Sequence, residues 1–230
     1  MARLLIHVEG QTEETFVNEV LAPHLYQHGY SKVSARLLGN ARMRSRRGGI
    51  GPWISARNDI LNHLKEDSES RSTIMVDYYA LPQAGESPWP KRADSEMLAF
   101  PNKAVLIQNA IHAEICTEMG VNFKPSRFIP YIMMYEFEGL LFSNPYEFAK
   151  GIGRADLATQ FQNIRKLFST PEEINDSPQT APSKRIKNLV QNYDKPFMGT
   201  LAILEIGLDT IRKECPLFDN WVKCLEQGCE

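Results

Sequence analysis

Carboxylate side chains follow three short apolar runs of the chain, and each run has the length and composition of a buried strand. These acids are Glu9 after residues 4–8, Asp77 after residues 73–76, and Glu136 with Glu138 after residues 127–134. Ligands of parallel α/β sheets bind beyond the carboxyl ends of the strands, where such acids would meet. Hard divalent cations such as Mg²⁺ prefer oxygen ligands of this type. The pattern therefore predicts a metal site at one edge of a sheet.

The third acidic site carries two carboxylates. If its strand continues through Glu136 and Glu138, both side chains project to one face, and Phe137 points to the other. A cluster completed in this way can hold one or two metals and polarise a phosphodiester, one ion activating a water and the other stabilising the leaving oxygen. The alternative is that some of these acids only cap helices.

The elements that position the acids are those of an α/β fold. After Glu9 and Gly10, Thr12 has the character of a helix N-cap, and a helix is expected over residues 12–29 with an interruption at Pro23. Periodicity and stop signals also predict a strand at residues 33–38 and helices at residues 54–68 and 102–120, and Gly120 ends the second of these helices. The fold class predicted is a mainly parallel sheet flanked by helices.

The chain changes character after Ser143. Short helices are expected over residues 145–152, 155–167, 184–192, 201–206 and 217–227. We therefore predict an α/β core over residues 1–143 and a helical C-terminal region over residues 144–230 that packs on it. Residues 169–182, rich in Pro, Ser, Thr and acids, are the best candidate for a mobile boundary.

Two basic regions can contact phosphates. The loop at residues 39–53 carries several arginines among glycines, namely Arg42, Arg44, Arg46 and Arg47. Lys184 and Arg185 follow Pro182 at a predicted helix start, where backbone donors and positive side chains together suit a phosphate, and Lys195 can join them. The alternative in each case is a solvated surface segment.

A proline-rich segment follows Asp77. Residues 82–101 contain four prolines with Trp89 and Phe100 and are too irregular for a regular element. Loops of this length in compact domains tend to be lids or binding surfaces, and the alternative is a floppy insertion.

Histidines and cysteines add no further metal site to the prediction. His7 lies mid-strand and is interpreted as a core residue, and the helical histidines are interpreted as lacking a ligand spacing; these are His24, His28, His63 and His112. The four cysteines show no CxxC pair, so reduced thiols are expected.

Composition narrows the class of protein. The 230 residues are 43% hydrophobic and 23% charged, with a formal net charge of −2, which excludes a chain that coats nucleic acid by bulk electrostatics. No run is long enough to span a bilayer and no signal peptide is recognisable, so a cytoplasmic protein without a membrane partner is expected. Nothing in the composition predicts the oligomeric state.

The ordered motifs resemble a known family. Glu9-Gly10-Gln11-Thr12-Glu13, the strand ending in Asp77, and residues 136–143 resemble the Toprim-type core of the OLD-family nucleases. More closely, the chain resembles the bacterial family catalogued as domain of unknown function 4276. That likeness extends to residues 77–82, 181–186, 193–195, 206–208 and 215–218, and so covers nearly the full length.

The resemblance implies a Toprim-like fold and metal-dependent chemistry on phosphodiesters of DNA or RNA, with Mg²⁺ or Mn²⁺ as cofactor. Glu9 would be the general acid or base or a metal ligand, Asp77 would bind metal, and Glu136 and Glu138 would complete the site. Tyr79 is a departure, because Toprim proteins usually carry Asp-x-Asp where this chain has Asp77-Tyr78-Tyr79, and a tyrosine hydroxyl is a poor ligand for magnesium. Either Glu136 or Glu138 compensates, or the site is weakened.

Two functions follow from these expectations. The first is a nuclease or nuclease subunit of an anti-phage defence module, in which resembling proteins are often encoded beside ATPases, so that a separately encoded ATPase is the expected partner. The second is a non-catalytic module that docks such an ATPase or a phosphate ligand, and Tyr79 motivates it.

Overall fold

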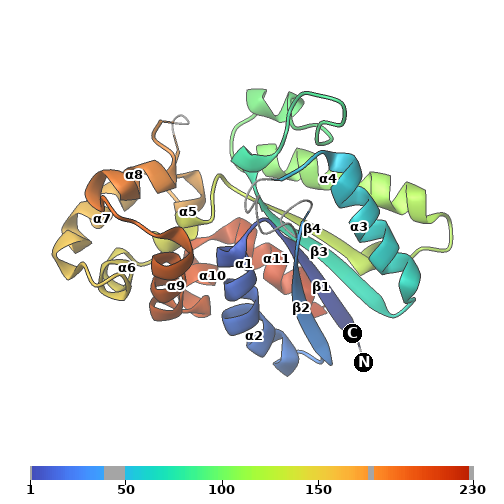
Figure 1. Ribbon diagram of the computed structural model, residues 1–230, viewed down its shortest axis with the longest axis horizontal. Coiled ribbons are helices and arrows are strands. Elements are labelled where there is room, and N and C mark those ends of the chain that lie inside the picture. The colour runs from blue at the N-terminus through green and yellow to red at the C-terminus, as the bar shows by residue number, and fades with distance from the viewer. Residues whose placement is uncertain (1, 39–49, 176–178, 228–230) are drawn as a thin grey trace. The chain divides into compact units, whose positions relative to one another are not determined.

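The computed structural model describes residues 2–38, 50–175 and 179–227 (Figure 1). The chain divides into two compact units. Unit 1 comprises Met1–Ile132 together with Trp221–Glu230, and unit 2 comprises Met133–Asn220. The predicted boundary lay between residues 143 and 144. The observed division instead falls between Ile132 and Met133, inside the last strand, and the end of the chain belongs to the α/β unit.

A four-stranded parallel sheet forms the centre of unit 1, in the order β2-β1-β3-β4. The strands are β1 (Arg3–Val8), β2 (Lys32–Leu37), β3 (Ser70–Asp77) and β4 (Phe128–Met133). The central strand β1 pairs with both neighbours, and its last residue, Val8, is level with Leu37 on one side and Met75 on the other. The predicted α/β fold with a parallel sheet is confirmed.

Helices cover both faces of this sheet (Figure 1). His7 of β1 meets the ring of His63 at 6.4 Å, so its face is covered by α3 (Trp53–Glu66), to which α4 (Asn102–Met119) is joined by Arg57 and Glu114. Thr73 of β3 points to the opposite face, because it is level with Ile6, and its Oγ1 accepts a hydrogen bond from Trp221 Nε1. The C-terminal part of α11 (Pro216–Gln227) covers that face.

The first helical segment is more divided than predicted. It consists of α1 (Gln11–Phe16), a π-helical turn η1 (Val17–Leu21) and α2 (Ala22–Gln27). Pro23 lacks a backbone N–H and so cannot continue the α-helical hydrogen-bond pattern, which accounts for the wider turn before it. Thr12 is not the N-cap, because the helix begins at Gln11 and Thr12 is buried inside its first turn.

The other predicted elements of unit 1 are present with small shifts at their ends. Helix α4 ends before Gly120, whose φ of 83° lies in the left-handed region that glycine adopts without strain. The remaining elements are single 3₁₀ turns, namely η3 (Tyr78–Ala80), η4 (Asp94–Met97) and η5 (Pro125–Arg127). In the described part of the chain, no helix combines the length and apolar character needed to cross a membrane.

Over its described residues, the regular elements of unit 2 after β4 are all helices or helical turns. Its elements are α5 (Glu138–Leu141), α6 (Pro145–Gly151), η6 (Ala155–Leu157), α7 (Ala158–Arg165), η7 (Pro171–Glu173), α8 (Pro182–Leu189), η8 (Lys195–Gly199), α9 (Thr200–Ile206), α10 (Leu208–Glu214) and the start of α11. The prediction that residues 169–182 form a boundary is wrong, because this segment lies within unit 2 and buries Glu172, Ile174 and Ala181. Ile174 and Ala181 are buried although the segment is polar in composition.

Candidate metal site at the strand ends

Glu9 and Asp77 lie at the outgoing ends of neighbouring parallel strands. Val8 is level with Met75, so Gly10 is level with Asp77 when the register is continued by two residues. Asp77 is 5% exposed, whereas Glu9 is half-buried. This is the placement predicted from the sequence, and the metal-binding role of the two carboxylates stays a prediction.

Glu13 is a third acid beside this strand end, and the sequence analysis did not select it as a site residue. It stands in the first turn of α1 and is 2% exposed. Its Oε2 lies 3.1 Å from the point that a Cβ on Gly10 would occupy, so the carboxylate folds back over the glycine. A signal existed: Glu13 shares its helical face with Phe16 and Val17, three and four positions on, and both are buried.

The segment after Asp77 is anchored rather than floppy. Tyr78 is buried, its hydroxyl lies 3.0 Å from Ser95 Oγ, and the guanidinium of Arg92 lies 3.9 Å above its ring. Trp89 is 1% exposed and packs on Trp53 with ring centroids 4.9 Å apart. Residues 82–101 therefore fold as an ordered extension from the strand end. Whether they form a binding surface, as predicted, stays a prediction.

Glu136 and Glu138 do not extend a strand, so the condition under which both would project to one face is not met. β4 ends at Met133, Phe137 has helical backbone angles (φ −49°, ψ −38°), and Glu138 begins α5. The physical reason is the spacing of buried side chains: Phe137, Leu140 and Leu141 recur at helical intervals and are all buried. That spacing outweighs the alternation of Glu136, Phe137 and Glu138.

Glu136 caps a helix in unit 2. Its Oε2 accepts a hydrogen bond of 2.8 Å from the backbone N–H of Ser183, in the first turn of α8. The start of α8 was predicted to hold a phosphate. One of its backbone N–H donors is already used by the Glu136 carboxylate. Of the two basic residues there, Lys184 is exposed, and Arg185 donates from Nε to the carbonyl oxygen of Thr180 at 2.7 Å.

Glu138 is paired with Lys195, which the sequence analysis grouped with Lys184 and Arg185 as a phosphate contact. The Lys195 Nζ lies 3.2 Å from Glu138 Oε2, and the carboxylate side chain is almost fully buried. Burial raises the pKa of Glu138, the neighbouring Lys195 lowers it, and Glu136 raises it further; the net direction is upward. The Glu138 carboxylate therefore balances the charge of Lys195 inside unit 2, whether or not it also binds a ligand.

The predicted basic loop is only partly covered by the described residues. Arg42, Arg44, Arg46 and Arg47 lie outside the described residues. Among the residues that are described, the group with three possible metal-ligand atoms within 4.8 Å of one another is His24, His28 and Glu226, and it contains none of the predicted acids.

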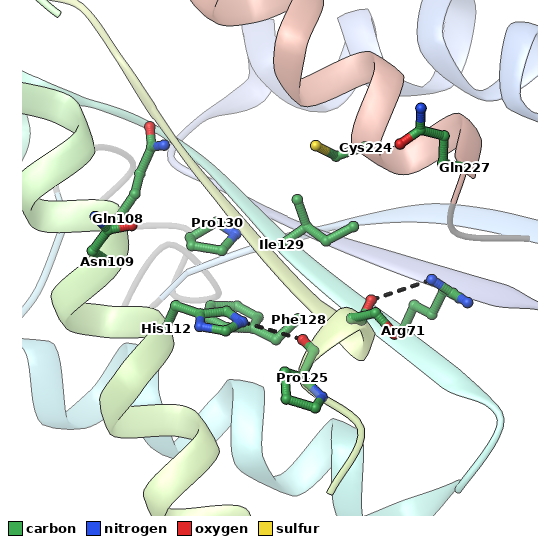
Figure 2. Close-up of a pocket in the computed structure, with 11 residues that line it drawn as sticks. Arg71, Gln108, Asn109, His112, Pro125, Phe128, Ile129, Pro130, Cys224 and Gln227 are labelled. Carbon is green, nitrogen blue, oxygen red and sulfur yellow. Dashed lines mark hydrogen bonds between the residues drawn. The ribbon is translucent and has the colours of Figure 1, made fainter.

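A pocket of about 470 Å³ lies at the incoming ends of β3 and β4, away from Glu9 and Asp77 (Figure 2). His112 lies along one wall, with its ring stacked on Phe128 and its Nε2 3.2 Å from the carbonyl oxygen of Pro125. Cys224 and Gln227 of α11 form the facing wall. The sequence analysis did not predict this pocket, because its lining comes from four segments far apart in the chain.

Comparison with known proteins identifies the family. The model of the domain of unknown function DUF4276 matches residues 8–226, from the end of β1 almost to the end of α11. The chain belongs to the DUF4276 family. No curated protein and no solved structure matches it. The DUF4276 match thus spans both units and includes Glu9, Glu13 and Asp77.

Proposed function

We propose that this DUF4276 protein is a Toprim-like nuclease or nuclease subunit that hydrolyses phosphodiesters of DNA or RNA with Mg²⁺ or Mn²⁺. The observation that carries the proposal is the placement of Glu9 and Asp77 at the outgoing ends of neighbouring parallel strands, with Glu13 beside them. Crevices at this edge of parallel sheets are the usual ligand sites of α/β folds. The proposed setting is an anti-phage module with a separately encoded ATPase, and it follows from the resemblance described in the sequence analysis.

The donor chemistry of the strand end fits the proposed ion. All three side chains offer carboxylate oxygens, and Mg²⁺ is commonly held by one or two carboxylates while it keeps several waters. The bound ion would lower the pKa of a water and stabilise the leaving oxygen of the phosphodiester. Glu9, which is half-buried, is then the residue with access to accept or donate a proton, and buried Asp77 is the fixed ligand.

A second candidate function is favoured by the contacts in unit 2. Glu136 and Glu138, predicted to complete the site, are engaged by Ser183 N–H and by Lys195. Tyr79 stands where a second aspartate is expected of a Toprim site, and it is half-buried in the 3₁₀ turn after β3. These features support a non-catalytic module that uses the same fold to dock an ATPase or a phosphate ligand.

The deciding experiment measures metal binding and cleavage in the same variants. Isothermal titration of Mg²⁺ and Mn²⁺ into wild type, Glu9→Gln, Asp77→Asn and the double variant is followed by cleavage assays on plasmid DNA, single-stranded DNA and RNA. The assays are run with the protein alone and with the ATPase encoded beside it. Glu69→Gln is the matched control, because this exposed acid lies just before the incoming end of β3.

The nuclease proposal predicts saturable metal binding that Glu9→Gln and Asp77→Asn abolish and Glu69→Gln leaves intact. Loss of one catalytic carboxylate should lower cleavage by about 10²-fold or more, the scale of a lost electrostatic or acid–base contribution. An ATPase complex that forms with wild type and with the double variant alike, in the absence of any metal binding or cleavage, would overturn it in favour of the docking module.

A further inference from the structure

Two histidines of α2 and one glutamate of α11 converge in unit 1. His24 lies in the last turn of α2, and His28 caps the same helix four positions later. Glu226 comes from the other end of the chain, on the part of α11 that belongs to unit 1. The three residues bring a possible ligand atom each within 4.8 Å of the other two.

We propose that His24, His28 and Glu226 form a binding site for a borderline divalent transition metal, with Zn²⁺ as its typical occupant. One imidazole nitrogen from each histidine and one carboxylate oxygen form a donor set that suits such an ion. Mg²⁺, in contrast, prefers oxygen ligands alone. From the sequence alone, the two histidines were interpreted as lacking a ligand spacing. That interpretation overlooked that positions i and i+4 of a helix share one face.

The distances agree with a three-ligand site. Nε2 of His24 lies 2.6 Å from Glu226 Oε1, Nε2 of His28 lies 3.6 Å from the same oxygen, and the two rings are 4.7 Å apart. Ligands 2.0–2.2 Å from a tetrahedral Zn²⁺ are separated by about 3.3–3.6 Å. The His28 distance already lies in this range, and the His24 distance needs to open by less than the width of an atom.

A bound metal would engage all three groups, whereas the two contacts seen with Glu226 are unequal. The hydrogen bond from His24 engages Glu226 Oε1, and His28 approaches the same oxygen at a distance too long for a hydrogen bond. A single ion satisfies both imidazoles and the carboxylate at once. His24 and Glu226 side chains are 21% and 15% exposed, and His28 is 39% exposed, so water can occupy a fourth position, as in zinc sites that keep one open.

The bound metal would link α2 to the C-terminal part of α11 within unit 1. The site lies beside the hydrogen bond of 2.8 Å from the Tyr30 hydroxyl to the Leu225 carbonyl, which already joins the same segments. It also lies at the incoming edge of the sheet, because α2 leads within a few residues into the start of β2, and Ser31 N–H bonds to the carbonyl of Ala2 before β1. The site is therefore separate from the strand ends that carry Glu9 and Asp77.

The test uses the full chain in a Cys116→Ser/Cys224→Ser/Cys229→Ser background, because thiols compete for Zn²⁺ and Cys116 lies 3.8 Å from a ring nitrogen of His112. Zn²⁺ is titrated into this background, into His28→Gln and Glu226→Gln, and into Glu9→Gln/Asp77→Asn. His112→Gln serves as the matched histidine control. Melting temperatures are measured with and without Zn²⁺, so that a folding defect is separated from a lost ligand.

We expect one equivalent of Zn²⁺ to bind and to raise Tm by about 5–10 °C when Zn²⁺ is present at about 100 times its Kd. His28→Gln should weaken binding by at least about 10-fold with an unchanged metal-free Tm, since losses of this size follow even from altered ligand support. His112→Gln and Glu9→Gln/Asp77→Asn should bind as the background does. No binding at micromolar Zn²⁺, or binding that His28→Gln leaves unchanged, would overturn the site without bearing on the strand-end acids.

Discussion

Acids in the two units have different surroundings although their sequence contexts are similar. In unit 1, Glu9 and Asp77 end neighbouring strands of a parallel sheet. In unit 2, Glu136 accepts the Ser183 N–H, Glu138 pairs with Lys195, and Glu172 accepts backbone N–H groups from the first turn of α11. The first set lies at the sheet edge where α/β folds usually bind ligands, and the second set makes contacts within the helical unit.

This difference shows that an acid after an apolar run is an ambiguous signal. The run before Glu9 and the run before Glu136 both form strands, but only the first leads directly through a glycine into a helix. Around Glu136, the next buried side chains begin a helix at once and turn the acid toward another helix. The comparison predicts that substitutions in unit 2 change stability, whereas substitutions at the strand ends change ligand binding.

The largest expected effect on stability is that of Glu172→Ala. This carboxylate is 1% exposed and accepts the N–H groups of Leu217 and Phe218 at 2.9 and 3.0 Å. Removing it leaves both donors without their charged acceptor, which costs about 3 kcal/mol or more of the free energy of unfolding. The neighbouring Glu173→Ala is the control and should cost about 0.5 kcal/mol or less. Urea unfolding of both variants measures the difference, and equal losses would contradict the assigned cap.

Glu138→Gln is expected to change how stability depends on pH. Burial raises the pKa of Glu138 in the folded protein, so the folded state binds the proton more tightly than the unfolded chain does. Its contribution to the free energy of unfolding is fully present below the ordinary pKa and is lost as pH rises through the raised pKa. The variant has no such group.

Urea unfolding of wild type and Glu138→Gln between about pH 4 and about pH 8 tests this, a range that begins near the ordinary carboxyl pKa. The wild-type stability minus that of the variant should fall as pH rises. Lys195→Met removes the cation that lowers the pKa, so it should move the fall to higher pH. A difference that stays constant or rises with pH would show that burial does not control this carboxyl group.

Glu136→Ala should have a smaller effect, about 1 kcal/mol, as typical for the loss of a helix cap. Glu136→Gln keeps an acceptor oxygen for the Ser183 N–H and should cost less. Thermal melts give the stabilities, and Mn²⁺ titration of Glu136→Gln sharpens the comparison. If Glu136→Gln weakened Mn²⁺ binding and left the melting temperature unchanged, Glu136 would be a metal ligand, and the proposed difference between the two units would be wrong.

The smallest expected effect on stability comes from Gly10→Ala. The backbone at Gly10 (φ −147°, ψ −177°) suits any residue, and the added Cβ would meet the end of the Glu13 side chain at 3.1 Å. The free energy of unfolding should change by about 0.5 kcal/mol or less. If Glu13 supports the metal, its displacement should weaken Mn²⁺ binding by about 10-fold, comparable to the loss of ligand support elsewhere. Unchanged Mn²⁺ affinity in a titration would separate Glu13 from the site.

Much of the fold could be predicted because its signals are local. The strands that lead to Glu9 and Asp77 and the long helix that Gly120 ends are evident from periodicity and stop residues. The same methods missed α10 and the helical spacing after Phe137, where short elements overlap with turn signals. They also missed Glu13, because first-turn acids are usually exposed and this one is buried.

The sequence by itself determined that strands lead to Glu9 and Asp77 and that a helix follows Glu9, and it placed both acids at the outgoing ends of parallel strands. Only the tertiary structure decided that Glu136 and Glu172 cap helices and that Glu226 meets His24 and His28. The physical reason is range: hydrogen-bond periodicity and turn geometry act over a few residues, whereas a cap or a ligand set depends on packing between segments far apart in the chain.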